Sequence, residues 1–297
     1  MGKFDGVLLA SDFDNTLVWT EDALRQGTAM PQVPERNREA LRYFMANGGR
    51  FAISTGRALP AFRHFVDQVP MNAPGVVCNG AGLYDFQADR YIYTALLDDV
   101  VRDRGMEILK AFPTVGCEVY HESDNVHAVQ PNHWTKKHQH LTHAPYREMP
   151  DLWSIPEPCA KLLFEEEMPV LTRIGEYLKE RGWAEDYELI FSSDHLLELT
   201  ARGAHKGGMV LRLAQLLGIE REHIYCIGDH ANDIPMLEVA AEAFAPANCI
   251  DAVRATGARI LSPCQDGAVA DLVEILDRRY GADRGETGKE EEKKCQP

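Results

Sequence analysis

The sequence of 297 residues lacks the features of a secreted or membrane-spanning protein. Its seven cysteines form no CxxC pair, and an odd number of scattered cysteines is typical of free thiols in a reducing compartment. No apolar run approaches the roughly 18 residues of a membrane span, and no basic-then-apolar signal segment begins the chain. We therefore expect a soluble, cytoplasmic protein without a disulfide framework.

Basic residues are also scarce, since 31 Lys and Arg stand against 46 Asp and Glu. Proteins that bind nucleic acid or anionic membranes need basic surfaces to neutralise phosphates, so we expect neither partner. A small phosphorylated metabolite would need only a local positive site. The composition predicts no oligomeric state.

Strand-like and helix-like patterns alternate at both ends of the chain. An apolar run at 6–10 precedes a helical pattern at 34–47, and a second short apolar run follows at 51–53. Far along the chain, an apolar helical stripe at 209–217 is followed by another buried strand at 224–227. This alternation predicts an α/β core with a parallel sheet.

The stretch between these blocks has a different pattern. Two aromatic segments at 84–86 and 91–93 flank a polar turn like a hairpin, and strand candidates at 161–164 and 187–191 are rich in aromatic or aliphatic residues. We predict an inserted α+β domain at 84–193 and a discontinuous core at 1–83 and 194–280. Residues 281–297 are dominated by Gly, Glu and Lys and have no apolar face, which predicts a disordered tail.

Two carboxylates, Asp12 and Asp14, directly follow the first predicted strand. In open α/β sheets, ligands bind at the carboxyl ends of the strands, so this is where chemistry is expected. Taken alone, the pair is just as typical of a turn held by side-chain hydrogen bonds to the backbone. The pair therefore needs support from the rest of the chain.

Polar residues and one glycine follow three further strand ends or helix starts. They are Thr55, Gly56 and Arg57 after the second strand, Lys206 at the start of the later helix, and Asp229, Asn232 and Asp233 after the strand at 224–227. Each has an ordinary structural explanation, such as a helix cap, a residue that favours the helix dipole or a solvated lysine. Four such elements in this order predict that the strand ends form an active site.

With these four elements, the sequence resembles the haloacid dehalogenase superfamily over residues 6–280. Asp12, Asp14 and Thr16 match its first motif, Thr55 the second, Lys206 the third, and residues 228–233 the fourth. The insert is similar to the C2B cap of Cof-like, subclass IIB phosphatases, and Asn15 adds some likeness to the sucrose-phosphate phosphatase-like branch. The resemblance implies a Rossmann-like core with a parallel sheet and an inserted α+β cap.

The resemblance also implies an activity. It is that of a magnesium-dependent phosphatase that hydrolyses a small phosphorylated metabolite, such as a sugar or polyol phosphate, through an aspartyl phosphate. Asp12 would be the nucleophile and Asp14 the acid and base. Mg²⁺ would be bound by Asp12, Asp14 and Asp229, with Asp233 supporting these ligands from behind.

The same resemblance assigns the phosphate-binding residues. Thr55, Gly56, Lys206 and Asn232 would hold the phosphoryl oxygens. Arg57 would either reach the substrate or anchor the loop through a carboxylate. These residue types supply the donors and the positive charge that a transferring phosphoryl group needs.

Two alternatives stay open at this point. A phosphomutase of the C2B-capped phosphomannomutase type shares the DxDxT start, although its second and fourth motifs usually differ from those seen here. A non-catalytic phosphometabolite-binding protein is less favoured, because a binder has no need of a general acid. We assign no role to the cluster of aromatic residues in the insert, which comprises His133, Trp134, His138, His140 and His143.

Overall fold

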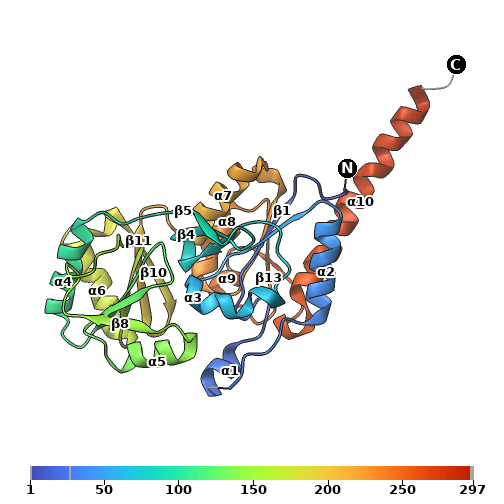
Figure 1. Cartoon of the computed structure of the whole chain (residues 1–297). Coiled ribbons are helices and arrows are strands. Elements are labelled where there is room, and N and C mark those ends of the chain that lie inside the picture. Colours follow the sequence, from blue (N-terminus) through green and yellow to red (C-terminus); the bar gives the residue numbers. More distant parts are fainter. Residues whose placement is uncertain (1, 27, 295–297) are drawn as a thin grey trace.

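A five-stranded parallel sheet forms the centre of one lobe of the molecule (Figure 1). The computed structural model describes residues 2–26 and 28–294, and the side chains of all of these except 24 and 282–294. In spatial order the strands are β14 (Arg259–Ile260), β13 (Glu242–Ala245), β12 (Ile224–Ile227), β1 (Leu8–Ser11) and β2 (Arg50–Ile53).

Alternate residues of the central strands face two different layers of helices. Leu9 and Phe51 pack with α2 (Glu35–Ala46) and α10 (Ala268–Lys294), which lie side by side on one face. Leu8, which precedes Leu9 in β1, packs with α7 (Lys206–Leu217) and α8 (Ile234–Val239) on the other face of the sheet. Because both faces are covered, polar side chains gather where the strands end. Shorter helices complete this lobe: α1 (Glu21–Gln26), α3 (Leu59–Phe62) and α9 (Asp251–Arg254).

A six-stranded mixed sheet forms the second lobe (Figure 1). Its strands, in spatial order, are β10 (Tyr187–Ser193), β11 (Leu196–Ala201), β9 (Lys161–Glu165), β6 (Gly116–Tyr120), β7 (Val126–Val129) and β8 (Tyr146–Met149). Helices α4 (Val100–Ala111) and α6 (Met168–Glu180) pack on one face of this sheet, and α5 (His133–Thr142) connects β7 to β8. The opposite face of this sheet is turned toward the first lobe. We call this second lobe the cap.

The predicted hairpin exists, but it pairs with a different sheet from the one expected. Strands β4 (Gly82–Asp85) and β5 (Arg90–Thr94) join β3 (Gly75–Val77) in a three-stranded antiparallel sheet, and β3 is bridged to the end of β2. The return strand β11 likewise belongs to the cap sheet, where it pairs with β9 and β10. The predicted break at 83 therefore falls within β4, and the one at 193 falls in the turn between the paired strands β10 and β11. We propose boundaries near 95 and 201 instead.

Helix α10 extends along the surface of the first lobe and away from it (Figure 1). The helix includes much of the segment 281–297 for which we expected disorder, but the side chains from 282 and the backbone from 295 lie outside the described residues. The expectation of a disordered tail therefore stays a prediction. Within the described part of the chain, no helix has the length and apolar character needed to cross a membrane.

Gly207 allows α7 and α8 to approach closely. A Cβ atom added to Gly207 would lie 2.0 Å from the carbonyl oxygen of Pro235 in α8. We predict that Gly207→Ala pushes the two helices apart and lowers the free energy of unfolding by about 1–3 kcal/mol. The matched control is Gly281→Ala, because a Cβ there meets nothing within 4 Å and alanine favours helix. Urea denaturation of both variants measures the difference, and equal stabilities would contradict the prediction.

Candidate active site

The ammonium group of Lys206 joins two loops at the carboxyl end of the core sheet. Lys206 Nζ lies 2.6 Å from Asp12 Oδ1 and 2.6 Å from Asp233 Oδ1. Lys206 and Asp233 are fully buried, and Asp12 is 6% exposed. Asp12 comes directly after β1, and its backbone N–H donates to the carbonyl of Ile227 at the end of β12. The first, third and fourth predicted motifs therefore meet at one point.

Asp233 organises the loop that carries Asp229. Its Oδ2 accepts hydrogen bonds from the backbone N–H groups of Asp229 (2.9 Å) and His230 (3.0 Å). Asp229 in turn accepts a hydrogen bond of 2.7 Å from the hydroxyl of Thr16. A spacing of four residues is typical of two side chains on one helix face, but Asp229 and Asp233 do not share one. Residues 231–233 instead form a 3₁₀ turn that precedes α8. Their carboxylates meet because Asp233 closes this turn.

Crowding of carboxylates shifts their proton affinities. Burial, together with the nearby Asp233, raises the pKa of Asp12 to about 7. Burial and the charge of Asp12 raise the pKa of Asp229 well above its ordinary value. Although burial favours a neutral amine, Asp12 and Asp233 raise the pKa of Lys206, so it stays an ammonium. The site thus contains more negative charge than one lysine balances.

The guanidinium group of Arg57 binds the carboxylate of Asp14. Its Nε and Nη2 donate to the two carboxylate oxygens of Asp14 at 2.8 and 2.7 Å, and the Thr20 hydroxyl adds a third bond of 2.7 Å. Burial opposes ionisation of Asp14, but the charge and hydrogen bonds of Arg57 lower its pKa below the ordinary value. Of the two functions considered for Arg57, the structure shows the anchoring contact. The turn is completed by Asn15, which adopts a left-handed φ of 56°.

A chain of side-chain amides connects this site to the cap. The amide of Asn232 donates to Asn79 Oδ1 (2.9 Å), and the amide of Asn79 donates to Glu198 Oε1 on β11 (2.7 Å). Asn79 is buried and adopts a left-handed φ of 54°. Its amide also closely approaches Gly56, where an added Cβ would lie 2.9 Å from Asn79 Nδ2. The sequence analysis did not place Asn79 in the site, and the structure shows that its approach to Gly56 requires the absence of a Cβ there.

A cavity of about 430 Å³ lies between the core and the cap. Six of the predicted site residues line it: Asp12, Asp14, Gly56, Arg57, Asp229 and Asn232. The others, Thr55, Lys206 and Asp233, are buried immediately behind, where Lys206 contacts Asp12 and the Thr55 hydroxyl accepts from the N–H of Arg57 (3.1 Å). The predicted residues thus converge, while their individual roles stay predictions.

The cap contributes a wall of buried polar residues to this cavity. Lys161 Nζ on β9 lies 3.0 Å from Glu198 Oε2, and both side chains are almost fully buried. His138 of α5 lies beside them, with its Nδ1 3.0 Å from Glu118 Oε2 and 3.4 Å from Glu165 Oε1. These residues alternate along β6, β9 and β11 with apolar ones that face α4 and α6.

Of the aromatic cluster in the insert to which we assigned no role, only His138 lines the cavity. Trp134 instead stacks on His195, with ring centroids 3.5 Å apart. The sequence around His138, from 133 to 143, contains no carboxylate. The structure brings Glu118 and Glu165 to it from two strands, at separations that linear spacing does not show.

The donor set at the strand ends fits a hard divalent cation. Carboxylate oxygens of Asp12, Asp229 and Asp233 all lie within 4.8 Å of one another. Asp233 already accepts from Lys206 and two backbone N–H groups, so Asp12 and Asp229 are the groups with capacity to spare. Oxygen ligands of this kind suit Mg²⁺, whose charge would relieve the repulsion that raises the pKa of Asp229.

The architecture and this site define a class of protein. A family model of the haloacid dehalogenase-like hydrolases matches residues 9–273. The chain therefore belongs to the haloacid dehalogenase-like hydrolase family. Its structure is similar to a hydrolase of this type from Bacteroides thetaiotaomicron, with a TM-score of 0.75, 22% identity, and coverage of 91% of this chain and 99% of that one.

Two relatives with assigned activities are phosphatases. The chain is 26% identical to a 5-amino-6-(5-phospho-D-ribitylamino)uracil phosphatase of Bacillus subtilis, covering 90% of this chain and 97% of the relative. It is 22% identical to the pyridoxal phosphate phosphatase of Escherichia coli, again over 90% and 97%. The subclass IIB sugar phosphatase BT4131 has the same fold, with a TM-score of 0.75, 19% identity, and coverage of 91% and 98%. The predictions of an α/β fold with a parallel core and an inserted cap, and of a phosphatase of this superfamily, are confirmed.

Replacement of Asp233 tests the buried ion pair. Asp233→Asn keeps the shape of the side chain but leaves the Lys206 ammonium with Asp12 as its one carboxylate contact among those described. We predict a loss of about 3–5 kcal/mol in the free energy of unfolding, because a buried ammonium group loses one of its two charged partners. Urea denaturation measures the loss. Asp22→Asn is the control, since it disrupts an exposed pair with Arg25 and should change stability by less than about 1 kcal/mol.

The cap wall generates a prediction of pH dependence. Burial, followed by the charge of Glu118, raises the pKa of Glu165 from 4.5 to about 8 in the folded protein. The folded state therefore holds a proton that the unfolded state has lost, and stability falls as the pH rises from about 4.5 to about 8. We predict that Glu165→Gln reduces this fall.

Thermal unfolding of wild type and Glu165→Gln between pH 5 and about pH 9 measures the two slopes, which span the shift in Glu165. The exposed Glu180→Gln on the same lobe is the control and should keep the wild-type slope. Parallel curves for wild type and Glu165→Gln would show that Glu165 ionises normally.

Proposed function

We propose that this enzyme is a magnesium-dependent phosphatase that hydrolyses a small phosphorylated metabolite, a sugar or polyol phosphate, through an aspartyl phosphate. The observation that supports this most directly is Asp12, which lines the cavity at the tip of β1, 2.6 Å from the Lys206 ammonium. Phosphate monoesters hydrolyse extremely slowly without help, so a site must supply a positioned nucleophile and neutralise charge. Asp12 and Lys206 together meet both requirements.

In the proposed first step, a carboxylate oxygen of Asp12 attacks phosphorus and the bond to the leaving oxygen breaks. Lys206, Thr55, Asn232 and the backbone at Gly56 hold the phosphoryl oxygens. Bound Mg²⁺, held by Asp12 and Asp229 with a backbone oxygen of Asp14, would neutralise charge on the phosphoryl group. Asp233 keeps Lys206 and the Asp229 loop in position through its three hydrogen bonds.

Asp14 is proposed to protonate the leaving oxygen and then to remove a proton from the water that hydrolyses the acyl phosphate. The bidentate contact with Arg57 fixes the carboxylate beside Asp12 and favours its ionised form, which suits the second step. The first step needs Asp14 protonated. Binding of the substrate would therefore weaken the contact between Arg57 and Asp14, so that Asp14 takes up the proton that it then gives to the leaving oxygen.

The cap supports the choice of substrate class. A cavity of about 430 Å³ suits a small metabolite, and its cap wall offers hydroxyl, imidazole, ammonium and carboxylate groups from Tyr120, His138, Lys161 and Glu198. Such groups bind hydroxyl-rich leaving groups by hydrogen bonds. The relatives point the same way, because they include a sugar phosphatase and phosphatases for phosphorylated ribityl and pyridoxal compounds. Cytoplasmic localisation belongs to this proposal and is compatible with the six described cysteines, which are all free and buried.

Asp12→Asn tests the proposed nucleophile. We predict that phosphate release from p-nitrophenyl phosphate and from a panel of sugar and polyol phosphates falls by about three orders of magnitude or more, because the first covalent step is lost. Removal of Mg²⁺ with a chelator should abolish release by the wild type, and added Mg²⁺ should restore it. The exposed Asp67→Asn, which lies outside the cavity, is the matched control and should retain full activity.

The same assay separates the proposal from its alternatives. Conversion of a hexose 1-phosphate into its isomer without free phosphate would indicate a phosphomutase. Tight binding of phosphorylated ligands without turnover in the presence of Mg²⁺ would indicate a binding protein. An active Asp12→Asn variant would refute the nucleophile assignment.

A further inference from the structure

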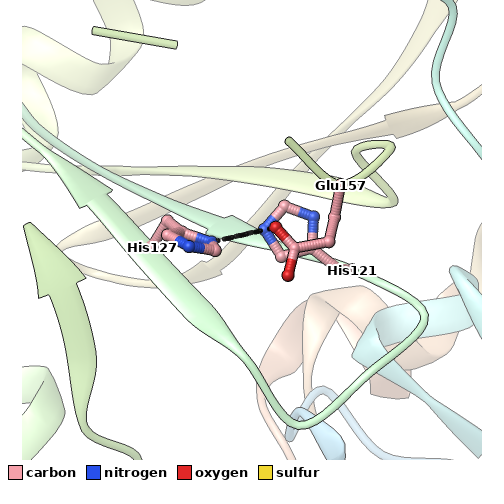
Figure 2. A group of neighbouring side chains, drawn as sticks. All are labelled: His121, His127 and Glu157. Atoms are coloured by element: carbon pink, nitrogen blue, oxygen red, sulfur yellow. Dashed lines mark hydrogen bonds and ion pairs between the residues drawn. The ribbon is translucent and has the colours of Figure 1, made fainter. Parts of the chain in front are cut away.

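A second group of metal-ligating side chains lies in the cap, outside the cavity. His121 follows β6, His127 belongs to β7, and Glu157 lies in the loop before β9 (Figure 2). One ligand atom of each lies within 4.8 Å of the others. His121 and His127 are 3% and 5% exposed, while the Glu157 side chain is 30% exposed and gives a route from solvent. The proposed phosphatase chemistry uses none of the three.

The hydrogen bonds of His121 fix which of its nitrogens is available. Its Nδ1 lies 2.8 Å from the carbonyl oxygen of Pro158, and because a carbonyl only accepts, Nδ1 carries the proton. In the neutral ring, Nε2 then presents a lone pair toward His127 Nδ1, 2.9 Å away. Burial lowers the pKa of His121, which keeps the ring in this neutral form. A histidine that binds a metal typically donates its other N–H to a carbonyl in this way.

Glu157 is oriented by one oxygen and leaves the other unused. Its Oε1 accepts a hydrogen bond of 2.9 Å from the amide of Asn125. Its Oε2 is buried without a hydrogen-bond partner and lies 3.9 Å from His127 Nδ1. Figure 2 shows the carboxylate beside the contact between the two rings. A buried carboxylate oxygen without a partner is costly, and a bound cation would satisfy it.

We propose that His121, His127 and Glu157 form a binding site for a divalent transition metal of the zinc type. Two imidazole nitrogens and one carboxylate oxygen are a ligand set that zinc favours, and Mg²⁺ does not compete well for imidazole. To bind, His127 needs its proton on Nε2 instead of Nδ1, so the lone pair of Nδ1 faces the ion and no proton is lost overall. Water completes the coordination.

The other cap cluster is a weaker candidate for such a site. Glu118, His138 and Glu165 offer a single imidazole, whose Nδ1 already lies 3.0 Å from Glu118 and 3.4 Å from Glu165. His138 also lines the phosphatase cavity, so this group belongs with the substrate wall. The His121 group is separate from that wall and contains two imidazoles.

An ion at this site would brace the part of the cap that touches the core. The loop between His121 and His127 carries Asp124, whose carboxylate contacts Arg63 Nε of the core at 3.1 Å. The segment at 157–160 is tied to the connection between the lobes, since the N–H of Leu97 donates to the carbonyl of Cys159. The metal would join this segment to the β6–β7 loop.

Titration with Co²⁺ tests the site, because Co²⁺ can occupy zinc sites. It absorbs visible light strongly when its coordination number is low and nitrogen atoms are among its ligands. We would use the full chain carrying Asp229→Asn, freed of metal and kept in a large excess of Mg²⁺, so that the strand-end carboxylates contribute little. We expect one equivalent of Co²⁺ with strong visible absorption, displaced by Zn²⁺, and a higher melting temperature with metal. Bound Zn²⁺ is counted by elemental analysis.

Variants of the ligands are then compared with a matched control. In the same background, His127→Gln and Glu157→Gln should each weaken Co²⁺ binding more than about tenfold, and Asn125→Ala, which frees the Glu157 carboxylate, by about tenfold. The control is the double variant His140→Gln with His143→Gln. It removes two exposed imidazoles at the end of α5, whose ring centroids lie 6.4 Å apart, and it should leave Co²⁺ binding unchanged.

Two results would overturn the proposal. One is the absence of strong visible absorption at saturating Co²⁺, which would leave the two histidines as a hydrogen-bonded pair only. The other is Co²⁺ binding that survives Glu157→Gln unchanged. Because Glu157 is partly exposed and its replacement leaves both histidines in place, this variant decides the matter even where His127→Gln does not fold.

Discussion

The structure of the site depends on one buried ammonium group held between two carboxylates. Lys206 lies at the start of α7, Asp12 at the end of β1 and Asp233 just before α8, so a single pair of 2.6 Å contacts fixes three elements that are far apart in sequence. Removing such charges from water is expensive, and the cost is offset only while all partners are in place. The protein therefore retains an ion pair that an apolar core would not need, and this is consistent with a catalytic use of Lys206 and Asp12.

The arrangement of the sheet explains why these groups can meet. All the core pairings are parallel, and helices cover both faces, so the chain can place polar groups only at the ends of the strands. The two faces of the cap sheet differ in polarity. One of its faces is buried under α4 and α6, while the opposite face carries Lys161, Glu198 and Glu118 toward the core. The cavity is thus bounded by the strand ends of one sheet and by the polar face of another.

Much of this could be predicted from the sequence, because buried parallel strands are short apolar runs and their polar ends are easy to recognise. The converging positions of Asp12, Lys206 and Asp229 followed from that pattern. The pairing of the β4–β5 hairpin did not, since local turn signals define a hairpin without saying which sheet it joins. The same limit applies to β11, whose alternation fits either sheet.

Contacts between side chains on different elements were beyond sequence reasoning for a related reason. Asn79 meets Glu198, 119 residues further along the chain, and His138 meets Glu118 and Glu165 from two neighbouring strands. No spacing rule relates these partners. Asp233 is the instructive case, because the four-residue interval from Asp229 suggested a shared helix face. The chain instead forms a turn that uses the Asp233 carboxylate as its cap.

The strand β11 leads directly into the loop before α7, so Glu198 and Lys206 belong to one short stretch of chain. Glu198 accepts from Asn79 and faces Lys161 at the cap wall, while Lys206 holds Asp12. An insertion or deletion between these two residues would shift the cap wall and the charged centre relative to each other, so the length of this stretch sets the position of both.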